Sequence, residues 1–309
     1  MTDLIKKKDE VLRKRNTPAR YIKADLKDFD LPSLGRFDVI LIDPPWEEYS
    51  KRITNLNSKI MESNKDISYW TYNELANLQV DAISNNPSFL FLWVGCSEGL
   101  EIGRLLMKKW GFRRCEDVVW IKTNKSSASL GFSSSFNEDP NSILKHSKEH
   151  CLLGIKGTVK RGQDNHFIHA NIDTDVIVSE EPPLGSTRKP DELYHIIERF
   201  CLGRKRIELF GEDHNIRPGW LTVGRNITDT CFDQVEYEGW FKGDSSYPIL
   251  QGYEGGKYVG TTAEIEQIRP KSPIRPPVGI LPLQILNNSI TGKFIKTKMQ
   301  PLPNQLPHQ

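Results

Sequence analysis

The chain has 309 residues, with 42 Lys and Arg against 40 Asp and Glu, which gives a formal net charge of +2. Hydrophobic residues make up 37% of it, and no apolar run approaches the ~18 residues of a membrane span. These totals exclude a membrane protein, and the net charge is too near neutral to indicate a nucleic-acid binder by itself. They are compatible with one large α/β domain carrying extensions.

The N-terminal segment, residues 1–19, is charged throughout and has no apolar signal core, so we predict a charged extension there. The cysteines are scattered without a C-x-x-C pair, which indicates free thiols in a reducing compartment, the cytosol or the nucleus. They are Cys96, Cys115, Cys151, Cys201 and Cys231.

Apolar, β-branched runs of strand length recur along the chain. They cover residues 37–42, 88–95, 116–123, 150–157, 175–180, 206–211 and 220–224. Their continuous hydrophobicity indicates burial on both faces of a sheet. Helical patterns with matching start and stop signals lie at 97–111 and 189–203. The alternation predicts a doubly wound α/β fold whose ligand site lies at the carboxyl ends of the strands.

Two segments do not fit this sheet. Residues 124–149 are rich in Ser and Asn and are interpreted as a long mobile loop of the kind that often covers a site. From about Arg269 onward the chain is Pro-rich, and we predict that it lacks independent structure.

The strongest chemical signal is the tetrapeptide Asp43-Pro44-Pro45-Trp46, directly after the apolar run 37–42. Asp43 should emerge at the carboxyl edge of the sheet. The prolines fix a stiff turn and leave their carbonyls free to point into a cleft, and Trp46 adds a flat aromatic face. The expected set is two hydrogen-bond acceptors beside a stacking platform.

An exocyclic amino group on a nucleobase needs such a set. Acceptors for both N–H bonds favour a pyramidal nitrogen with an available lone pair, and an aromatic ring offsets part of the cost of taking the base out of a helix. The Asp43 carboxylate would also stabilise a positively charged sulfonium methyl donor. The alternative, an ordinary Pro-rich turn with a packed Trp, stays open at this point.

A second polar turn follows the run 206–211. Phe210-Gly211 allows a close approach of the backbone, and His214 and Asn215 offer donors and acceptors to a polar small molecule. Lys189, at the start of a predicted helix, could meet a carboxylate there. The spacing of the histidines matches no tetrahedral zinc pattern, so we predict no metal site.

Longer motifs resemble the eukaryotic N6-adenine methyltransferases, the family that includes both subunits of the mRNA N6-methyladenosine writer. The likeness covers roughly residues 20–272 and rests on "DPPW", "FLFLWVG", "GFRRCEDVVWIKTNK", "KEHCLLGIKGTVKR", "KPDELYHIIERF", "RKRIELFG" and "HNIRPGW". It implies a Rossmann-like class I S-adenosylmethionine-dependent methyltransferase, with a mostly parallel sheet, helices on both faces and the catalytic motif preceding the cofactor-binding turn. The implied organisation is an extension (1–19), a methyltransferase domain (20–272) and a Pro-rich extension (273–309).

The resemblance also implies roles for individual residues. Asp43, Pro44, Pro45 and Trp46 match the catalytic loop. The expected cofactor contacts are Asp25, Leu26, Asp43, Lys189, Phe210, His214, Asn215 and Asn226. The basic residues expected to contact nucleic acid are Lys122, Lys160, Arg161 and Arg217.

Most of the body is more similar to the non-catalytic, RNA-scaffolding subunit of the writer. That subunit, however, has a degenerate tetrapeptide and has lost the His-Asn pair, both of which this chain keeps. The combination is similar to the ciliate DNA N6-adenine methyltransferases. Glu212 and Arg225 stand where catalytic subunits usually carry an arginine and an asparagine.

The prediction is therefore an S-adenosylmethionine-dependent N6-adenine methyltransferase acting on nucleic acid, with DNA slightly preferred over RNA by resemblance only. We expect a nuclear protein that works as a heterodimer with a related methyltransferase-like subunit. Two alternatives remain: an RNA N6-adenosine methyltransferase subunit, and a non-catalytic nucleic-acid-binding scaffold that activates a partner.

Overall fold

The computed structural model describes residues 2–49, 69–123, 143–144, 146–159, 173–182, 186–200 and 205–241, together with 253–254, 257–258 and 267. The chain divides into two compact units, residues 1–270 and 271–309, and all described residues belong to the first. The Pro-rich extension predicted for 273–309 therefore lies outside the described residues.

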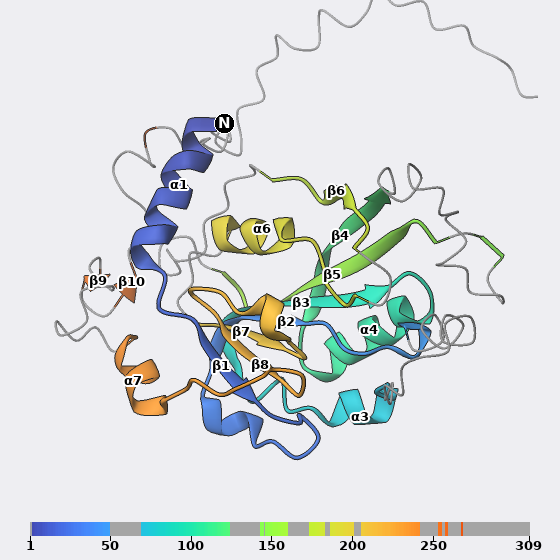
Figure 1. Cartoon of the computed structure of the whole chain (residues 1–309), viewed down its shortest axis with the longest axis horizontal. Helices are drawn as coiled ribbons and strands as arrows, with labels where there is room; N and C mark the ends of the chain where they lie inside the picture. Colours follow the sequence, from blue (N-terminus) through green and yellow to red (C-terminus); the bar gives the residue numbers. More distant parts are fainter. Residues whose placement is uncertain are drawn as a thin grey trace, which may run out of the picture. The chain divides into compact units, whose positions relative to one another are not determined.

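An eight-stranded sheet forms the centre of the first unit, in the order β1-β8-β7-β2-β3-β5-β4-β6 (Figure 1). Its strands are β1 (Arg20–Lys23), β2 (Phe37–Ile42), β3 (Ser84–Gly95), β4 (Arg113–Thr123), β5 (Lys148–Lys156), β6 (Val176–Glu180), β7 (Arg206–Leu209) and β8 (Leu221–Gly224). Within this sheet β5 runs antiparallel to both neighbours, and the other pairs are parallel. The predicted mostly parallel, Rossmann-like sheet is confirmed.

Helices lie on both faces of the sheet. They are α1 (Thr2–Arg15), α3 (Tyr72–Asn77), α4 (Glu98–Lys109), α6 (Glu192–Phe200) and α7 (Gln234–Gly239), with single 3-10 turns at Leu31–Leu34 and Asp213–Asn215. A short hairpin, β9 (Tyr253–Glu254) and β10 (Lys257–Tyr258), follows.

The alternation of side chains along β2 divides the core into two layers. Ile40 and Ile42 pack in the cluster that also holds α3, α4 and α7 side chains, whereas Val39 and Leu41 pack in the cluster with α6. All six residues of β2 are buried, as the continuous apolar run predicted. The residue that follows β2 therefore leaves the most enclosed part of the sheet.

Local sequence signals explain where α4 begins and ends. Glu98 and Glu101 lie in its first turn and Lys108 and Lys109 in its last, so each end carries the charge that complements the helix dipole. Gly111 follows with a φ of 80°, a left-handed conformation that glycine adopts without strain. The helix predicted at 97–111 corresponds to α4, which is shorter by one residue at its start and two at its end.

One predicted boundary differs from the structure, and one strand was not predicted. The loop predicted for 124–149 ends earlier, because Lys148 and Glu149 already pair with β4 in β5. Most of the remainder of that segment lies outside the described residues. β1 was not predicted, since it contains only four residues and only Ile22 of them is buried.

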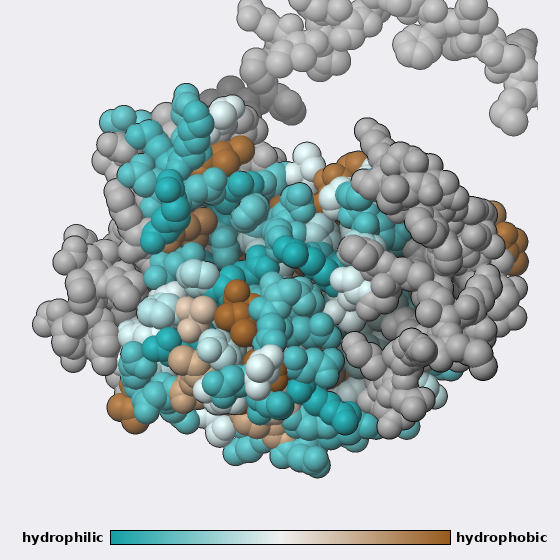
Figure 2. Space-filling view, viewed as in Figure 1, coloured by the Kyte–Doolittle hydropathy of each residue, from teal (hydrophilic) through white to brown (hydrophobic). Residues whose placement is uncertain are grey.

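The described surface in Figure 2 is mainly hydrophilic, with small separate hydrophobic patches. At the outer strands of the sheet, three apolar side chains stay exposed: Ile121 at 40%, Val176 at 42% and Val178 at 62%. None of the helices formed by the described residues is long and apolar enough to cross a bilayer.

The N-terminal segment corrects the prediction of a separate charged extension. Residues 2–15 form α1, which buries Leu4 and Leu12. Lys8 is also buried, and its Nζ donates to the backbone carbonyl of Arg199 in α6 at 2.7 Å. The charged composition hid the helix because its few apolar residues lie on one face.

If α1 belongs to the folded unit, Leu12→Ala should lower the free energy of unfolding by about 2–4 kcal/mol through the cavity it creates. Urea unfolding followed by circular dichroism measures this. The exposed neighbour Lys6 supplies the control, because Lys6→Ala should change stability by no more than about 0.5 kcal/mol. Equal stability of both variants would contradict the docking of α1.

Candidate active site

Four of the predicted site residues lie at the carboxyl ends of four neighbouring parallel strands, β1, β8, β7 and β2. Asp25 follows β1, Asn226 follows β8, Phe210 follows β7 and Asp43 follows β2. Parallel strands place their carboxyl ends at one edge of the sheet, which is where ligands bind in such folds. Residues that are far apart in sequence are thus brought to one edge.

Backbone hydrogen bonds fix the tetrapeptide at this edge. The Asp43 N–H donates to the carbonyl of Leu209 at 3.4 Å, which continues the β2–β7 ladder by one residue. The Pro45 carbonyl accepts from the Trp70 N–H at 3.0 Å. One of the two prolyl carbonyls expected to point into a cleft is therefore used inside the fold.

Trp46 corrects the prediction of an open stacking platform. Its side chain is only 4% exposed, and its indole Nε1–H donates to the Trp93 carbonyl in β3 at 2.7 Å. A buried indole with its N–H satisfied stabilises the loop. It offers no free face to a base.

Because Trp46 fills the core, Trp46→Ala should lower the free energy of unfolding by roughly 3–5 kcal/mol, whatever it does to activity. Trp46→Phe keeps an aromatic ring but loses the indole N–H, so its cost should be clearly smaller. Chemical unfolding of both variants tests this placement, and a stability unchanged in Trp46→Ala would refute it.

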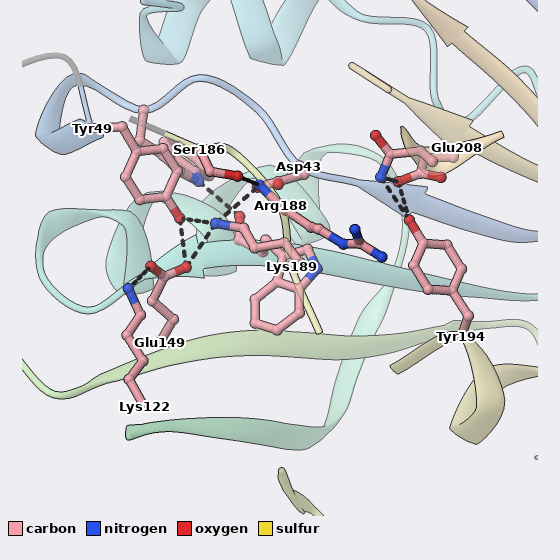
Figure 3. A network of polar contacts seen from close by, with 12 residues as sticks. Asp43, Tyr49, Lys122, Glu149, Ser186, Arg188, Lys189, Tyr194 and Glu208 are labelled. Carbon is pink, nitrogen blue, oxygen red and sulfur yellow. Dashed lines mark hydrogen bonds and ion pairs between the residues drawn. The ribbon is translucent and has the colours of Figure 1, made fainter. Parts of the chain in front are cut away.

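Beside the tetrapeptide lies a chain of buried polar contacts (Figure 3). The Lys189 Nζ lies 3.6 Å from Asp43 Oδ1 and 2.7 Å from Glu149 Oε2. The Lys122 Nζ lies 2.8 Å from Glu149 Oε1. The Tyr49 hydroxyl donates to Glu149 Oε2 at 3.1 Å and accepts from Lys189 Nζ at 3.1 Å. The strands β4 and β5, the segment after β2 and the segment before α6 supply these groups.

The charge of Glu149 is well compensated. Burial alone would raise its pKa, but the nearby Lys189 and Lys122 ammonium groups and their hydrogen bonds hold that pKa well below its ordinary value. Its side chain is 4% exposed. Glu149 is therefore a fixed buried anion held between two cations.

Asp43 has the opposite balance. Burial raises its pKa to about 7, because desolvation and the negative charges of Glu149 and Glu212 outweigh the attraction of Lys189. Its side chain is 18% exposed, but Oδ1 itself is buried and accepts no hydrogen bond from the residues that the structure describes. A carboxylate poised near neutrality with an unused acceptor is typical of functional sites.

The raised pKa of Asp43 makes stability depend on pH. Since the folded state keeps the proton to about pH 7 whereas the ordinary value is 3.8, the stability from protonated Asp43 is fully present below pH 3.8 and lost as pH rises through 7. Asp43→Asn should therefore become more stable than the unsubstituted chain as pH increases across this window, measured by urea unfolding.

Asp175→Asn, at an exposed aspartate just before β6, is the matched control for the amide substitution itself. A stability difference for Asp43→Asn that stays constant from pH 4 to about pH 8 would contradict the burial of this carboxylate.

Phe210 connects the tetrapeptide with the turn after β7. Its φ of 65° is unusual for a residue other than glycine, and such strain clusters at functional sites. Its ring meets the Trp70 ring edge-to-face at 4.9 Å, and Trp70 in turn binds the Pro45 carbonyl. The turn and the tetrapeptide loop are therefore packed as one unit.

Polar groups line the ends of β1 and β8. Asn226 Nδ2 donates to Glu212 Oε1 at 3.1 Å, and Arg225 Nε lies 4.0 Å from Asp25 Oδ2. Leu26 differs, because its side chain is 6% exposed and packs in the core. The Asp25 and Glu212 carboxylates are suited to a ligand that carries hydroxyl or amino donors.

Asn215 corrects the prediction that its amide contacts a cofactor. Its Nδ2 donates to the Tyr194 hydroxyl at 2.8 Å and to Glu208 Oε1 at 3.0 Å, and its Oδ1 accepts from the Glu212 N–H at 2.8 Å. Asn215 thus faces inward and shapes the turn. His214 beside it stays partly exposed, with Nδ1 3.6 Å from Glu212 Oε2, and burial lowers its pKa.

Glu208 is a second buried carboxylate in this region. Burial raises its pKa to about 8, although the hydrogen bond from the Tyr194 hydroxyl, at 2.7 Å, opposes the shift. Arg217 covers the Tyr194 ring, with its Cζ 3.3 Å from the ring centroid. This cluster joins β7, α6 and the turn that follows β7.

The basic residues predicted to contact nucleic acid divide into three cases. Lys122 corrects the prediction, because it is 10% exposed and pairs with Glu149 and with Glu181 at 3.0 Å. Arg217 is 20% exposed, and its Nη2 pairs with Asp191 at 2.9 Å. Its contacts are internal ones, so its contact with nucleic acid stays a prediction. Lys160 and Arg161 lie outside the described residues.

Sequence reasoning missed Tyr49 and Glu149. Tyr49 follows the tetrapeptide by three residues, and its distance from Asp43 along the chain was the available signal. Glu149 had none, because it was assigned to a loop, and only the β4–β5 pairing places it opposite Trp120 in the sheet. Among the described residues, no group of three or more His, Cys, Asp or Glu side chains could hold a metal ion.

The fold and the site define a Rossmann-like α/β protein with its polar residues at the carboxyl edge of the sheet. The chain belongs to the MT-A70 family, which matches residues 37–226. This confirms the resemblance deduced from the motifs.

The N(6)-adenosine-methyltransferase non-catalytic subunit METTL14 of Danio rerio is 47% identical over 272 residues, which are 88% of this chain and 55% of that protein. The non-catalytic subunit MTB of Arabidopsis thaliana is 50% identical over 188 residues, 60% of this chain and 23% of that protein. The N(6)-adenosine-methyltransferase MT-A70-like protein of Drosophila melanogaster is 34% identical over 212 residues, 68% and 30% of the two chains. The chain thus spans little more than half the length of the first relative.

Proposed function

We propose that this chain is a catalytically competent subunit of an N6-adenosine methyltransferase that uses S-adenosylmethionine and acts on RNA. The observation that carries the proposal is the buried, hydrogen-bond-deficient Oδ1 of Asp43 at the carboxyl edge of the sheet, beside the Lys189 ammonium. The predicted preference for DNA has no support in the names of the relatives, which refer to adenosine methylation. RNA is therefore the substrate of this proposal.

The residues at the strand ends fit a nucleoside-containing methyl donor. Asp25 and Glu212 supply acceptors for hydroxyl groups, and Phe210 and Asn226 lie beside them. The donor would supply an electrophilic methyl group on a positively charged sulfur. Asp43 and Glu149 are nearby anions that suit such a cation. When the methyl donor is not bound, the Lys189 ammonium balances their negative charge.

Asp43 would act on the acceptor amine. As a carboxylate it accepts a hydrogen bond from the adenine amino group through Oδ1, which favours the pyramidal nitrogen that can attack. With a pKa near 7, the same carboxylate can take up the proton that the methylated amine loses. Tyr49, which is partly buried, takes the place of Trp46 as the aromatic residue of this proposal; Lys189 Nζ donates to its hydroxyl and lies over its ring, 4.4 Å from the centroid.

A non-catalytic scaffold that binds nucleic acid and activates a partner is the second candidate. It is favoured by the 47% identity to a protein named as a non-catalytic subunit. In either case we propose a related methyltransferase-like partner and a nuclear location. The two candidates differ in one respect, because only the first requires Asp43 for turnover.

The decisive test is methylation of matched RNA and DNA oligonucleotides by the chain, alone and with its partner, with nucleosides resolved by mass spectrometry. We expect N6-methyladenosine in RNA, and a loss of about 100-fold or more in turnover for Asp43→Asn in an otherwise identical complex. Asp175→Asn should retain full turnover. Unchanged turnover in Asp43→Asn favours the scaffold, and methylation of DNA alone overturns the choice of substrate.

A further inference from the structure

The contacts around Lys189 are unequal. Its Nζ donates to Glu149 Oε2 at 2.7 Å, a short charge-assisted hydrogen bond, whereas Asp43 Oδ1 lies at 3.6 Å, beyond hydrogen-bond distance. Both Lys189 and Glu149 are nearly inaccessible, with 9% and 4% of their side chains exposed. The ammonium interacts with two carboxylates, and its interaction with Glu149 is the stronger one.

Lys122 explains why Glu149 stays where it is. Its ammonium binds the other carboxylate oxygen, Oε1, at 2.8 Å and is itself paired with Glu181 at 3.0 Å. Glu149 also sits in the middle of paired strands, opposite Trp120. With one oxygen held by Lys122 and the other by Tyr49 and Lys189, the carboxylate is fixed by both the sheet and its partners (Figure 3).

We propose that Glu149 is a positioning residue: anchored by Lys122, it holds the Lys189 ammonium away from Asp43 and so leaves Asp43 with an incomplete counter-ion. The inference concerns the state of the Asp43 carboxylate, and its use in methyl transfer rests on the proposed function. Lys122, interpreted from the sequence as a nucleic-acid contact, thereby acquires a role inside the protein.

The charged and titratable groups that act on Asp43 come from several elements. They are Glu149 and Cys151 of β5, Lys189 before α6, Glu208 of β7 and Glu212 after it, with Tyr49 and Lys122 acting through Glu149. Among these, Lys189 is the one cation next to Asp43, so its position decides how far the carboxylate charge is stabilised. The Asp43 pKa of about 7 is the expected consequence.

The arrangement has a functional logic. A fully paired Asp43 would stay ionised with its oxygens occupied by Lys189, and the adenine amine would have to displace that ammonium. With Lys189 held by Glu149, Oδ1 remains an unused acceptor. Asp43 can also exchange a proton near neutral pH.

The test removes the charge of Glu149, which competes with Asp43 for the Lys189 ammonium. It measures the titration of Asp43 and does not depend on enzymatic activity. The free energy of unfolding is measured from pH 4 to about pH 9 for four proteins: the unsubstituted chain, Asp43→Asn, Glu149→Gln and the double variant. Two differences in the free energy of unfolding are compared: the unsubstituted chain minus Asp43→Asn, and Glu149→Gln minus the double variant. Each difference should fall as pH rises and level off above the Asp43 pKa.

We expect Glu149→Gln to move this levelling-off to lower pH by about one unit, because Lys189 is then released to pair with Asp43. Gln keeps the size of the side chain, but its single amide oxygen cannot replace the two carboxylate oxygens that accept from Lys122 and Lys189. Glu181→Gln is the matched control, since it removes a carboxylate on the far side of Lys122, and the levelling-off should not move. An identical levelling-off pH in the Glu149→Gln background would falsify the proposal.

If Glu149→Gln does not fold, Lys122→Gln tests the same idea in the opposite direction. With Lys122 gone, Glu149 has Lys189 as its remaining ammonium partner among the contacts in Figure 3, so the levelling-off should move to higher pH. A shift to lower pH, or none, overturns the proposal. Because no methyl transfer is measured, a failed methylation assay leaves this result intact, and the two proposals fail separately.

Discussion

The Lys189 ammonium, shared between Glu149 at 2.7 Å and Asp43 at 3.6 Å, is the interaction on which the rest of the site depends. Burying several charges together is costly unless each one is paired, and this cluster pairs them in alternation from Asp43 to Glu181. The exception is Asp43 at the end of the chain of contacts, where burial raises the pKa to about 7. The incompletely compensated negative charge is thus placed at one atom, Asp43 Oδ1.

The fold holds these charged groups in fixed positions. β2 is buried along its whole length and delivers Asp43 to the carboxyl edge, while β5 and β4 supply Glu149 and Lys122 from within paired strands. The segment leading into α6 adds Lys189, and α6 itself adds Tyr194, which binds the second buried carboxylate, Glu208. The start of α6 thus contributes to both buried carboxylate clusters, so displacement of this helix would disturb the site and the turn after β7 together.

Much of the fold was accessible from the sequence, because buried strands read as continuous apolar runs. All seven predicted runs overlap strands of the sheet. The helix α1 was missed because its apolar residues are few and surrounded by charges. For the site, strand ends were enough to predict the places of Asp43 and Phe210, whereas Asn226 came only from the family resemblance.

The direction of side chains was not accessible. Trp46 and Asn215 lie where the motif analysis predicts, yet both face inward, because an indole N–H and an amide satisfy backbone and side-chain partners that only the tertiary structure brings near. Lys122 looked like a surface cation for the same reason, since its two carboxylate partners are distant in the sequence. Glu149 required the register between β4 and β5.

The family relationship leaves the chain between an enzyme and a scaffold, because a body similar to a non-catalytic subunit carries an intact tetrapeptide. Equilibrium titration of S-adenosylmethionine into the purified chain, alone and in complex with the proposed partner, addresses this most directly. We expect saturable binding that is weakened when Glu212→Ala removes the carboxylate at the end of β7. Absence of saturable binding in both the chain and the complex would contradict the claim that this site serves methyl transfer.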